Sequence, residues 1–189
     1  MENKYKILIP LIIAGAMGTV DTSVMNVAMP TLAEVFKVEM QTVSWISSAY
    51  LLVLAGLLLT AGRLGDIYGY KKPFEWGLFI FTVGTALCGC APSLVFLIAA
   101  RVFQAIGTSL FIAAIPAMIV SFFPPKERGK AMGLNVVSVS IGLTLGPSLG
   151  GLLLSRFIWR YIFIVFMVFE KTASFSCARF FGRILRSII

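Results

Sequence analysis

The sequence predicts an all-α membrane protein with five complete spans and a partial sixth. Of its 189 residues, 59% are hydrophobic and only 13% are charged, whereas ordinary soluble domains carry about a quarter charged residues. Its apolar stretches also meet or approach the roughly 20 residues that a helix needs to cross about 30 Å of hydrocarbon. The first partner that we expect is therefore the lipid bilayer.

Five apolar stretches account for the complete spans. Prolines punctuate them, and we expect Pro30 to end the first, Pro92 to separate the third from the fourth, and Pro124 with Pro125 to end the fourth. The loop at 31–44 is expected to hold a short surface helix. No small-residue cleavage site follows the first stretch, so we expect that span to be retained. The five stretches are 7–30, 45–62, 74–91, 94–120 and 131–154.

Basic residues fall mainly in alternate loops, which predicts the orientation. If the N-terminus is cytoplasmic, that side carries twelve of the sixteen lysines and arginines, and the positive-inside rule is satisfied. The prediction is a multi-pass protein of the cell membrane, and the net charge of +8 then needs no nucleic-acid partner. The twelve are Lys4, Lys6, Arg63, Lys71, Lys72, Lys126, Arg128, Lys130, Lys171, Arg179, Arg183 and Arg186.

The residue types give no sign of an enzyme. The chain has no histidine, and Cys88, Cys90 and Cys177 lack the spacing of metal ligands. No set of nucleophile, base and metal ligands is visible. We therefore expect no metal, no cofactor and no catalytic site.

Two charges lie inside apolar stretches, where a charge costs roughly 2.5–3.5 kcal/mol on insertion scales. Asp21 stands in a polar patch that extends to Asn26, and it could exchange protons, meet a cationic substrate or pair with a neighbouring helix. Arg101 has Gln104 and Thr108 on its own helix face. It could pair with a carboxylate and shift its pKa, or extend to the end of its span. The residues leave these alternatives open.

Glycines mark two further features. In the fifth stretch Gly142, Gly146 and Gly150 recur every four residues, which favours close helix packing. Pro147 beside them favours a kink or hinge. The segment 62–72 reads as a tight loop that mixes glycines, one carboxylate and basic residues, and its members of interest are Gly62, Asp66, Gly69, Lys71 and Lys72.

These motifs, in this order, resemble those of the major facilitator superfamily. The loop at 62–72 resembles the signature between its second and third helices, and Arg101 to Gln104 with Gly107 resembles its fourth-helix motif. Residues 21–30 look like the first-helix motif of its fourteen-helix multidrug proton antiporters. The fifth-helix motif of its antiporters is matched by Gly133, Gly142, Gly146, Pro147, Gly150 and Gly151.

The resemblance implies an exporter of drugs or toxic compounds, driven by inward proton flow and working by alternating access. Asp66 would hold a cytoplasmic gate through charge pairs, and the glycine-proline helix would form an interface that bends or seals. The implied partners are protons and small hydrophobic or cationic compounds. The residues that it implicates in proton or substrate coupling are Asp21, Asn26, Arg101 and Gln104.

The resemblance has two departures. Ala105 stands where the fourth-helix motif usually has glycine, and Phe166 stands where asparagine is expected, after which the likeness stops. We expect residues 1–169 to be an N-terminal half-bundle, inactive without a C-terminal half. Residues 170–189 read as an atypical basic tail, amphipathic or disordered, that comes from truncation or frameshift. The alternatives are a half-transporter that works as a dimer or with a partner chain, and a non-transporting protein whose tail binds anionic lipid.

Overall fold

The structure is a computed structural model, and it describes residues 2–156, 159–165 and 167. Five long helices follow one another: α1 (Glu2–Phe36), α2 (Met40–Tyr68), α3 (Lys71–Gly89), α4 (Leu94–Phe122) and α5 (Pro125–Arg156). A sixth helical segment begins at Arg160. The expected basic tail at 170–189 and the departure at Phe166 lie outside the described residues.

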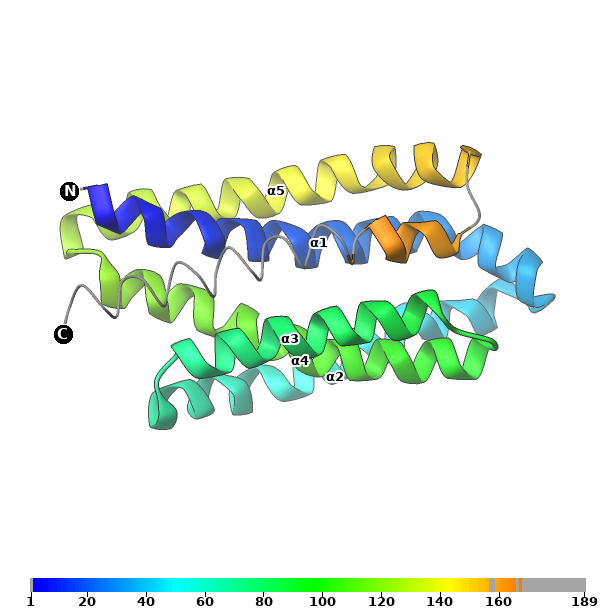
Figure 1. The fold of residues 1–189 in the computed structure, drawn as a ribbon, viewed down its shortest axis with the longest axis horizontal. Helices are drawn as coiled ribbons and strands as arrows, with labels where there is room; N and C mark the ends of the chain where they lie inside the picture. Colours follow the sequence, from blue (N-terminus) through cyan, green and yellow to red (C-terminus); the bar gives the residue numbers. More distant parts are fainter. Residues whose placement is uncertain (1, 157–158, 166, 168–189) are drawn as a thin grey trace.

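The helices run along one long axis, so that the chain turns alternately at the two ends of the bundle (Figure 1). One end holds the start of α1 and the α2–α3 and α4–α5 turns. The other holds the α1–α2 and α3–α4 turns and the end of α5. The main pairings are α3 with α4, α1 with α5, and α2 with α4. Such back-and-forth packing is what a chain that crosses a bilayer repeatedly requires.

Four of the described helices are long and apolar enough to cross a membrane by length and composition, and α3 is the exception among the five. With 19 residues, α3 carries Lys71, Lys72 and Glu75 among its first five residues, and these lower its apolar content. It still packs along α4 by backbone contact. A Cβ added to Gly77 would lie 2.7 Å from the carbonyl oxygen of Gly107.

Two expectations about the first connection were wrong. Pro30 lies inside α1, which continues to Phe36, and the expected surface helix does not form because α1 and α2 themselves fill most of 31–44. A proline removes one N–H donor, and membrane helices tolerate that loss. Only 37–39 separate the two helices. Lys37 takes a left-handed conformation with φ 53°, and the Val38 amide closes the turn on the Ala33 carbonyl at 3.1 Å.

The other proline signals were confirmed. Pro92 lies between α3 and α4, and the Ser93 hydroxyl next to it accepts a hydrogen bond from the Phe96 amide at 3.3 Å, which caps α4. Pro125 is the first residue of α5, a position where the missing N–H has no consequence.

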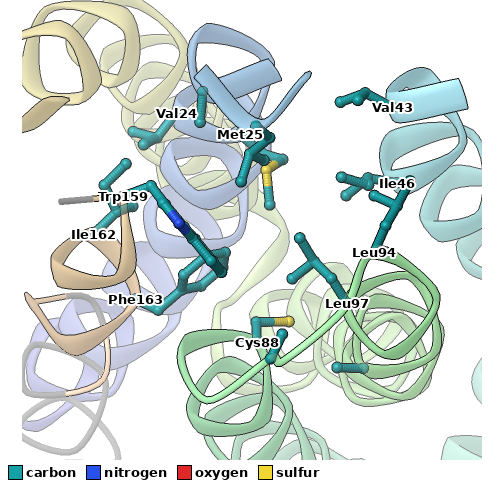
Figure 2. Packing of buried hydrophobic residues seen from close by; sticks show 14 residues of the cluster. Val24, Met25, Val43, Ile46, Cys88, Leu94, Leu97, Trp159, Ile162 and Phe163 are labelled. Atoms are coloured by element: carbon teal, nitrogen blue, oxygen red, sulfur yellow. The ribbon is translucent and has the colours of Figure 1, made fainter. Parts of the chain in front are cut away.

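The buried apolar side chains form two clusters, one toward each end of the bundle. The first includes Leu11, Phe81 and Phe111, and lies on the side of the N-terminus. The second, in Figure 2, gathers Met25, Leu97 and the side chains of the sixth segment. In α1, α3 and α4 the residues of the two clusters stand on either side of a short polar stretch, so a buried polar layer separates two apolar ones.

Candidate functional site

Asp21 of α1 and Arg101 of α4 form an ion pair in the polar layer. Arg101 Nη1 lies 2.6 Å from Asp21 Oδ2, and the two residues are 1% and 4% exposed. Gln104, one turn along α4, donates from Nε2 to Asp21 Oδ1 at 3.3 Å. Each carboxylate oxygen therefore has a hydrogen-bond donor from α4, as buried polar groups require.

The ion pair is enclosed by a wider network that we call the polar cluster. Arg101 Nη1 also donates to Gln104 Oε1 at 2.6 Å, and Gln104 Nε2 donates to the Thr85 hydroxyl of α3 at 2.8 Å. Tyr50 of α2 places its ring 5.0 Å from the Arg101 guanidinium carbon. Four helices thus meet here, in a cluster composed of Asp21, Tyr50, Thr85, Arg101, Gln104 and Thr108.

Thr108 connects Tyr50 to α4. The Tyr50 hydroxyl donates to Thr108 Oγ1 at 3.0 Å, and Thr108 donates in turn to the Gln104 carbonyl at 3.1 Å. The phenol oxygen is thus tied to α4 while the ring covers the guanidinium, a cation–π arrangement. Both contacts hold the side chain of Arg101 in one place.

Only one member of the ion pair can change its charge. Arginine stays protonated in proteins, whereas a carboxylate can take up a proton. Protonation of Asp21 would remove a buried negative charge and leave the guanidinium with the side-chain amide oxygen of Gln104 and the Tyr50 ring as its neighbours. The cluster can therefore convert the gain or loss of one proton into a change in the attraction between α1 and α4.

The structure brings together three of the four residues expected to act in coupling. Asn26 is the exception, because it is exposed and accepts a hydrogen bond from the Ser47 hydroxyl of α2 at 3.2 Å. The alternative in which Arg101 extends to the end of its span is wrong. Tyr50 and Thr85 were missed, since a lone tyrosine or threonine in an apolar span carries no signal of what it faces.

The segment 62–72 is mostly helical, so the expectation of a loop was wrong there. Gly62 and Asp66 belong to α2, while Lys71 and Lys72 open α3. Gly69, at φ 79°, makes the turn between them. Gly65 explains why the turn is so short: the ring of Tyr70 packs directly on it and leaves no room for a Cβ.

Asp66 contacts its own turn. It accepts a hydrogen bond from the Tyr70 hydroxyl, and that bond raises the pKa of Tyr70 above its ordinary value of 10.0. Lys71 pairs with Glu75 at 3.7 Å along α3. Nearby, a groove of about 800 Å³ opens between α2 and α4, with Asp66 and Arg63 among its lining residues and apolar side chains forming most of the rest.

The glycines of α5 divide into two groups. Gly142, Gly146 and Gly150 lie against α1, where added Cβ atoms would collide with or press on Thr19, Ser23 and Val24. Gly133 and Gly151 have nothing within 4 Å of an added Cβ. The buried stripe is therefore a close helix contact within this bundle, and its partner is the helix that carries Asp21.

Pro147 explains a polar contact in the same interface. Because proline has no N–H, the carbonyl four residues earlier, at Leu143, lacks its usual helical donor. The Ser23 hydroxyl of α1 donates to that carbonyl at 3.1 Å. One turn away, the Thr19 hydroxyl lies 3.4 Å from the Val139 carbonyl. The free carbonyl created by Pro147 is thus used to bind α5 to α1.

The fold and the polar cluster define a class: an all-α integral membrane protein with an ion pair buried between its spans. The chain belongs to the Major Facilitator Superfamily, whose family model matches residues 11–182. The match, together with the relatives below, assigns it to transporters rather than to enzymes.

Its relatives among characterised proteins are transporters or resistance proteins of bacteria. It is 40% identical over 165 residues to the riboflavin transporter RibZ of Clostridioides difficile, covering 87% of this chain and 36% of that protein. It is 36% identical over 146 residues to the multidrug resistance protein Stp of Mycobacterium tuberculosis, covering 77% and 27%. The methylenomycin A resistance protein of Streptomyces coelicolor is 37% identical over 150 residues, at 79% and 32%. The chain spans about a third of the length of these relatives.

Solved transporter structures share the fold. The proton:xylose symporter XylE superposes with a TM-score of 0.83 at 14% identity, over 94% of this chain and 45% of that one. An inward-facing bacterial homologue of the lysosomal transporter Spinster gives a TM-score of 0.78 at 18% identity, over 95% and 42%. These likenesses show that the chain shares the fold of part of these proteins.

The first prediction concerns the glycine stripe. Gly146→Ala places a methyl group 2.6 Å from Ser23 Cβ, and we expect it to destabilise the fold by about 1–3 kcal/mol, as overpacking does. Gly151→Ala is the matched control, because its added methyl meets open space. The measurement is unfolding in detergent micelles titrated with dodecyl sulfate and followed by circular dichroism. Equal effects of the two substitutions would contradict the contact.

The second concerns the carbonyl freed by Pro147. Ser23→Ala leaves the Leu143 carbonyl without a donor, and we expect a loss of about 1–3 kcal/mol. In a Pro147→Ala background the helix supplies an N–H to that carbonyl, so the same serine substitution should cost less. A double-mutant cycle measures the difference. Strict additivity would show that the two positions do not share this acceptor.

The third concerns the ion pair. Asp21→Asn leaves Arg101 buried without a counter-charge, and we expect the free energy of unfolding to fall by about 3–5 kcal/mol. Replacing both residues with leucine removes both charges and should restore part of the loss. A double variant less stable than Asp21→Asn would count against electrostatics as the main effect.

Proposed function

We propose that this chain forms the N-terminal half of a proton-coupled exporter of small hydrophobic or cationic compounds, with Asp21 as the group that takes up the proton. The observation that carries the proposal is the pairing of Asp21 with Arg101 and Gln104, buried where four helices meet. A structural role alone would be served as well by apolar side chains of similar volume.

The proposed coupling follows from the charges. While Asp21 is ionised, α1 is drawn to α4 by a short ion pair between apolar layers. When Asp21 is protonated, Arg101 loses its counter-charge in a low dielectric, and an arrangement with the two helices further apart or more hydrated becomes competitive. Export of a cation in exchange for a proton needs such a two-state element.

The groove between α2 and α4 is the proposed half of the substrate pathway. Its walls are largely apolar, from Leu58, Leu59 and Ile112, while Asp66 supplies a carboxylate at one end. These are the features that a hydrophobic cation would require. Because the chain spans about a third of its relatives' length, we propose that a C-terminal half completes the pathway. We retain Asp66 with the turn at Gly69 as the proposed gate.

The proposed orientation places the N-terminus in the cytoplasm of a cell-membrane protein. Basic residues at the ends of the described helices support it, because most belong to the end of the bundle that holds the start of α1 (Figure 1). They are Arg63, Lys71, Lys72, Lys126, Arg128 and Lys130, against Lys37, Arg156 and Arg160 at the opposite end.

A flavin is the second candidate substrate. The identity of 40% with the riboflavin transporter RibZ favours it, and the same polar cluster would serve proton coupling for either substrate. The two candidates differ in what the groove between α2 and α4 must accept: an aromatic ring system with a polar chain, or a lipophilic cation.

The test is transport by a chimera in proteoliposomes with an imposed pH gradient. The matched N-terminal segment of RibZ is replaced by this chain, and movement of ethidium and of riboflavin is followed by fluorescence. We expect proton-driven movement that Asp21→Asn abolishes, because the neutral amide cannot exchange a proton. Glu34→Gln, which alters an exposed carboxylate of the same helix, is the matched control. This chain alone is expected to move neither compound.

Proton-independent transport, or transport that survives Asp21→Asn, would overturn the proposed role of Asp21. Movement of riboflavin without ethidium would select the second candidate.

A further inference from the structure

A small pocket adjoins the ion pair on the side away from the groove between α2 and α4. Its volume is about 10 Å³, and it lies between α1, α4 and the sixth segment. Asp21 and Arg101 form its polar wall. Its other walls are apolar and consist of Met25, Ala28, Leu32, Trp159, Ile162 and Phe163. Figure 2 shows Trp159, Ile162 and Phe163 gathered beside Met25.

Arg101 has hydrogen-bonding capacity to spare at this place. Its Nη1 serves both Asp21 and Gln104, whereas its Nε is buried and has no partner in the protein. Buried donors in folded proteins are almost always satisfied, by protein or by water. Because Arg101 also lines the pocket, a ligand bound there can be the missing acceptor.

The volume and the charge of the pocket limit what it can bind. It reaches the lower limit of about 10–15 Å³ that one water molecule needs, and it is too small for anything larger. The guanidinium in its wall disfavours a cation. A water could accept from Arg101 Nε and donate to the Asp21 carboxylate, each of whose oxygens has one protein donor and a free lone pair.

We propose that this pocket binds a single water molecule that bridges Arg101 and Asp21. The position of the lining residues indicates the side from which it would exchange. Along α1 they run from Asp21 to Leu32, toward the end of the bundle that holds the α1–α2 turn. Trp159 lies at that end, packed against Phe36 with 5.7 Å between ring centroids, and Arg160 fixes the segment by donating to the Ala91 carbonyl at 3.0 Å.

In this proposal water reaches the ion pair through the seam between α1 and the sixth segment, whose side chains are buried in the structure and must move to admit it. This seam is separate from the groove that we propose for the substrate. Its use as the proton's route to Asp21 rests on the proposed function; the hydration site itself does not. In the proposed orientation, the seam leads to the outer face.

The experiment uses the full chain in lipid nanodiscs, labelled with ¹⁵N-arginine. The Nε–H resonance of Arg101 is assigned by its loss in Arg101→Lys, and cross peaks to water are recorded in paired nuclear and rotating-frame Overhauser spectra. We expect a cross peak between Arg101 Nε–H and water in the unmodified chain. Ala28→Val fills the pocket, so the cross peak should be lost. Ala99→Val, on an exposed face of α4, is the matched control and should retain it.

Ile162→Ala widens the seam and is expected to keep the cross peak while speeding exchange with bulk water. It tests the site even if the larger side chain at position 28 prevents folding. A resolved Arg101 signal without a water cross peak would overturn the proposal, and so would exchange that Ile162→Ala leaves unchanged. This experiment does not measure transport. If Arg101 gives no water cross peak while the chimera still exports with proton coupling, the hydration site is refuted and the proposed function is not.

Discussion

An ion pair in the middle of an apolar bundle requires hydrogen-bonding partners from the residues around it. A carboxylate and a guanidinium that are both almost wholly buried must find several hydrogen-bonding partners at once, because the low dielectric makes each unmet bond expensive. The ion pair of Asp21 and Arg101 meets most of this requirement by drawing on four helices, with Gln104 and Thr85 extending it to α3 and Tyr50 to α2. The relative positions of α1, α2, α3 and α4 at this level are fixed by that requirement.

α1 makes polar contacts with two different helices, on opposite faces. Successive residues of a helix are rotated by about 100°, so Asp21 points away from Thr19 and Ser23. The carboxylate meets α4, while the two hydroxyls meet carbonyls of α5. The glycine stripe of α5 lets that second contact be close. A change in the charge of Asp21 is thus felt by a helix that is already held firmly on its other side.

Much of the fold could be predicted from the sequence, because a membrane span depends on length and apolar content, both of which are local. The positions of α4 and α5 followed from Pro92 and the pair at 124–125, and the ion pair was one of the readings that two interior charges allowed. The prediction that Pro30 ends the first span was wrong, because the sequence does not show whether the surroundings of a proline compensate for its missing N–H. Tyr50 and the small pocket could not have been predicted at all, since each depends on which faces of distant helices meet.

The contact between α1 and α5 repeats every four residues on both helices: Thr19 and Ser23 on one, and Gly142, Gly146 and Gly150 on the other. Sliding one helix past the other by a fraction of a turn would drive side chains into the facing backbone. A shift of four residues, about 6 Å, would bring small residues opposite hydroxyls again. The interface therefore allows discrete registers that are four residues apart. Only the observed register sets Ser23 against the carbonyl that Pro147 leaves free, which favours it over registers four residues away.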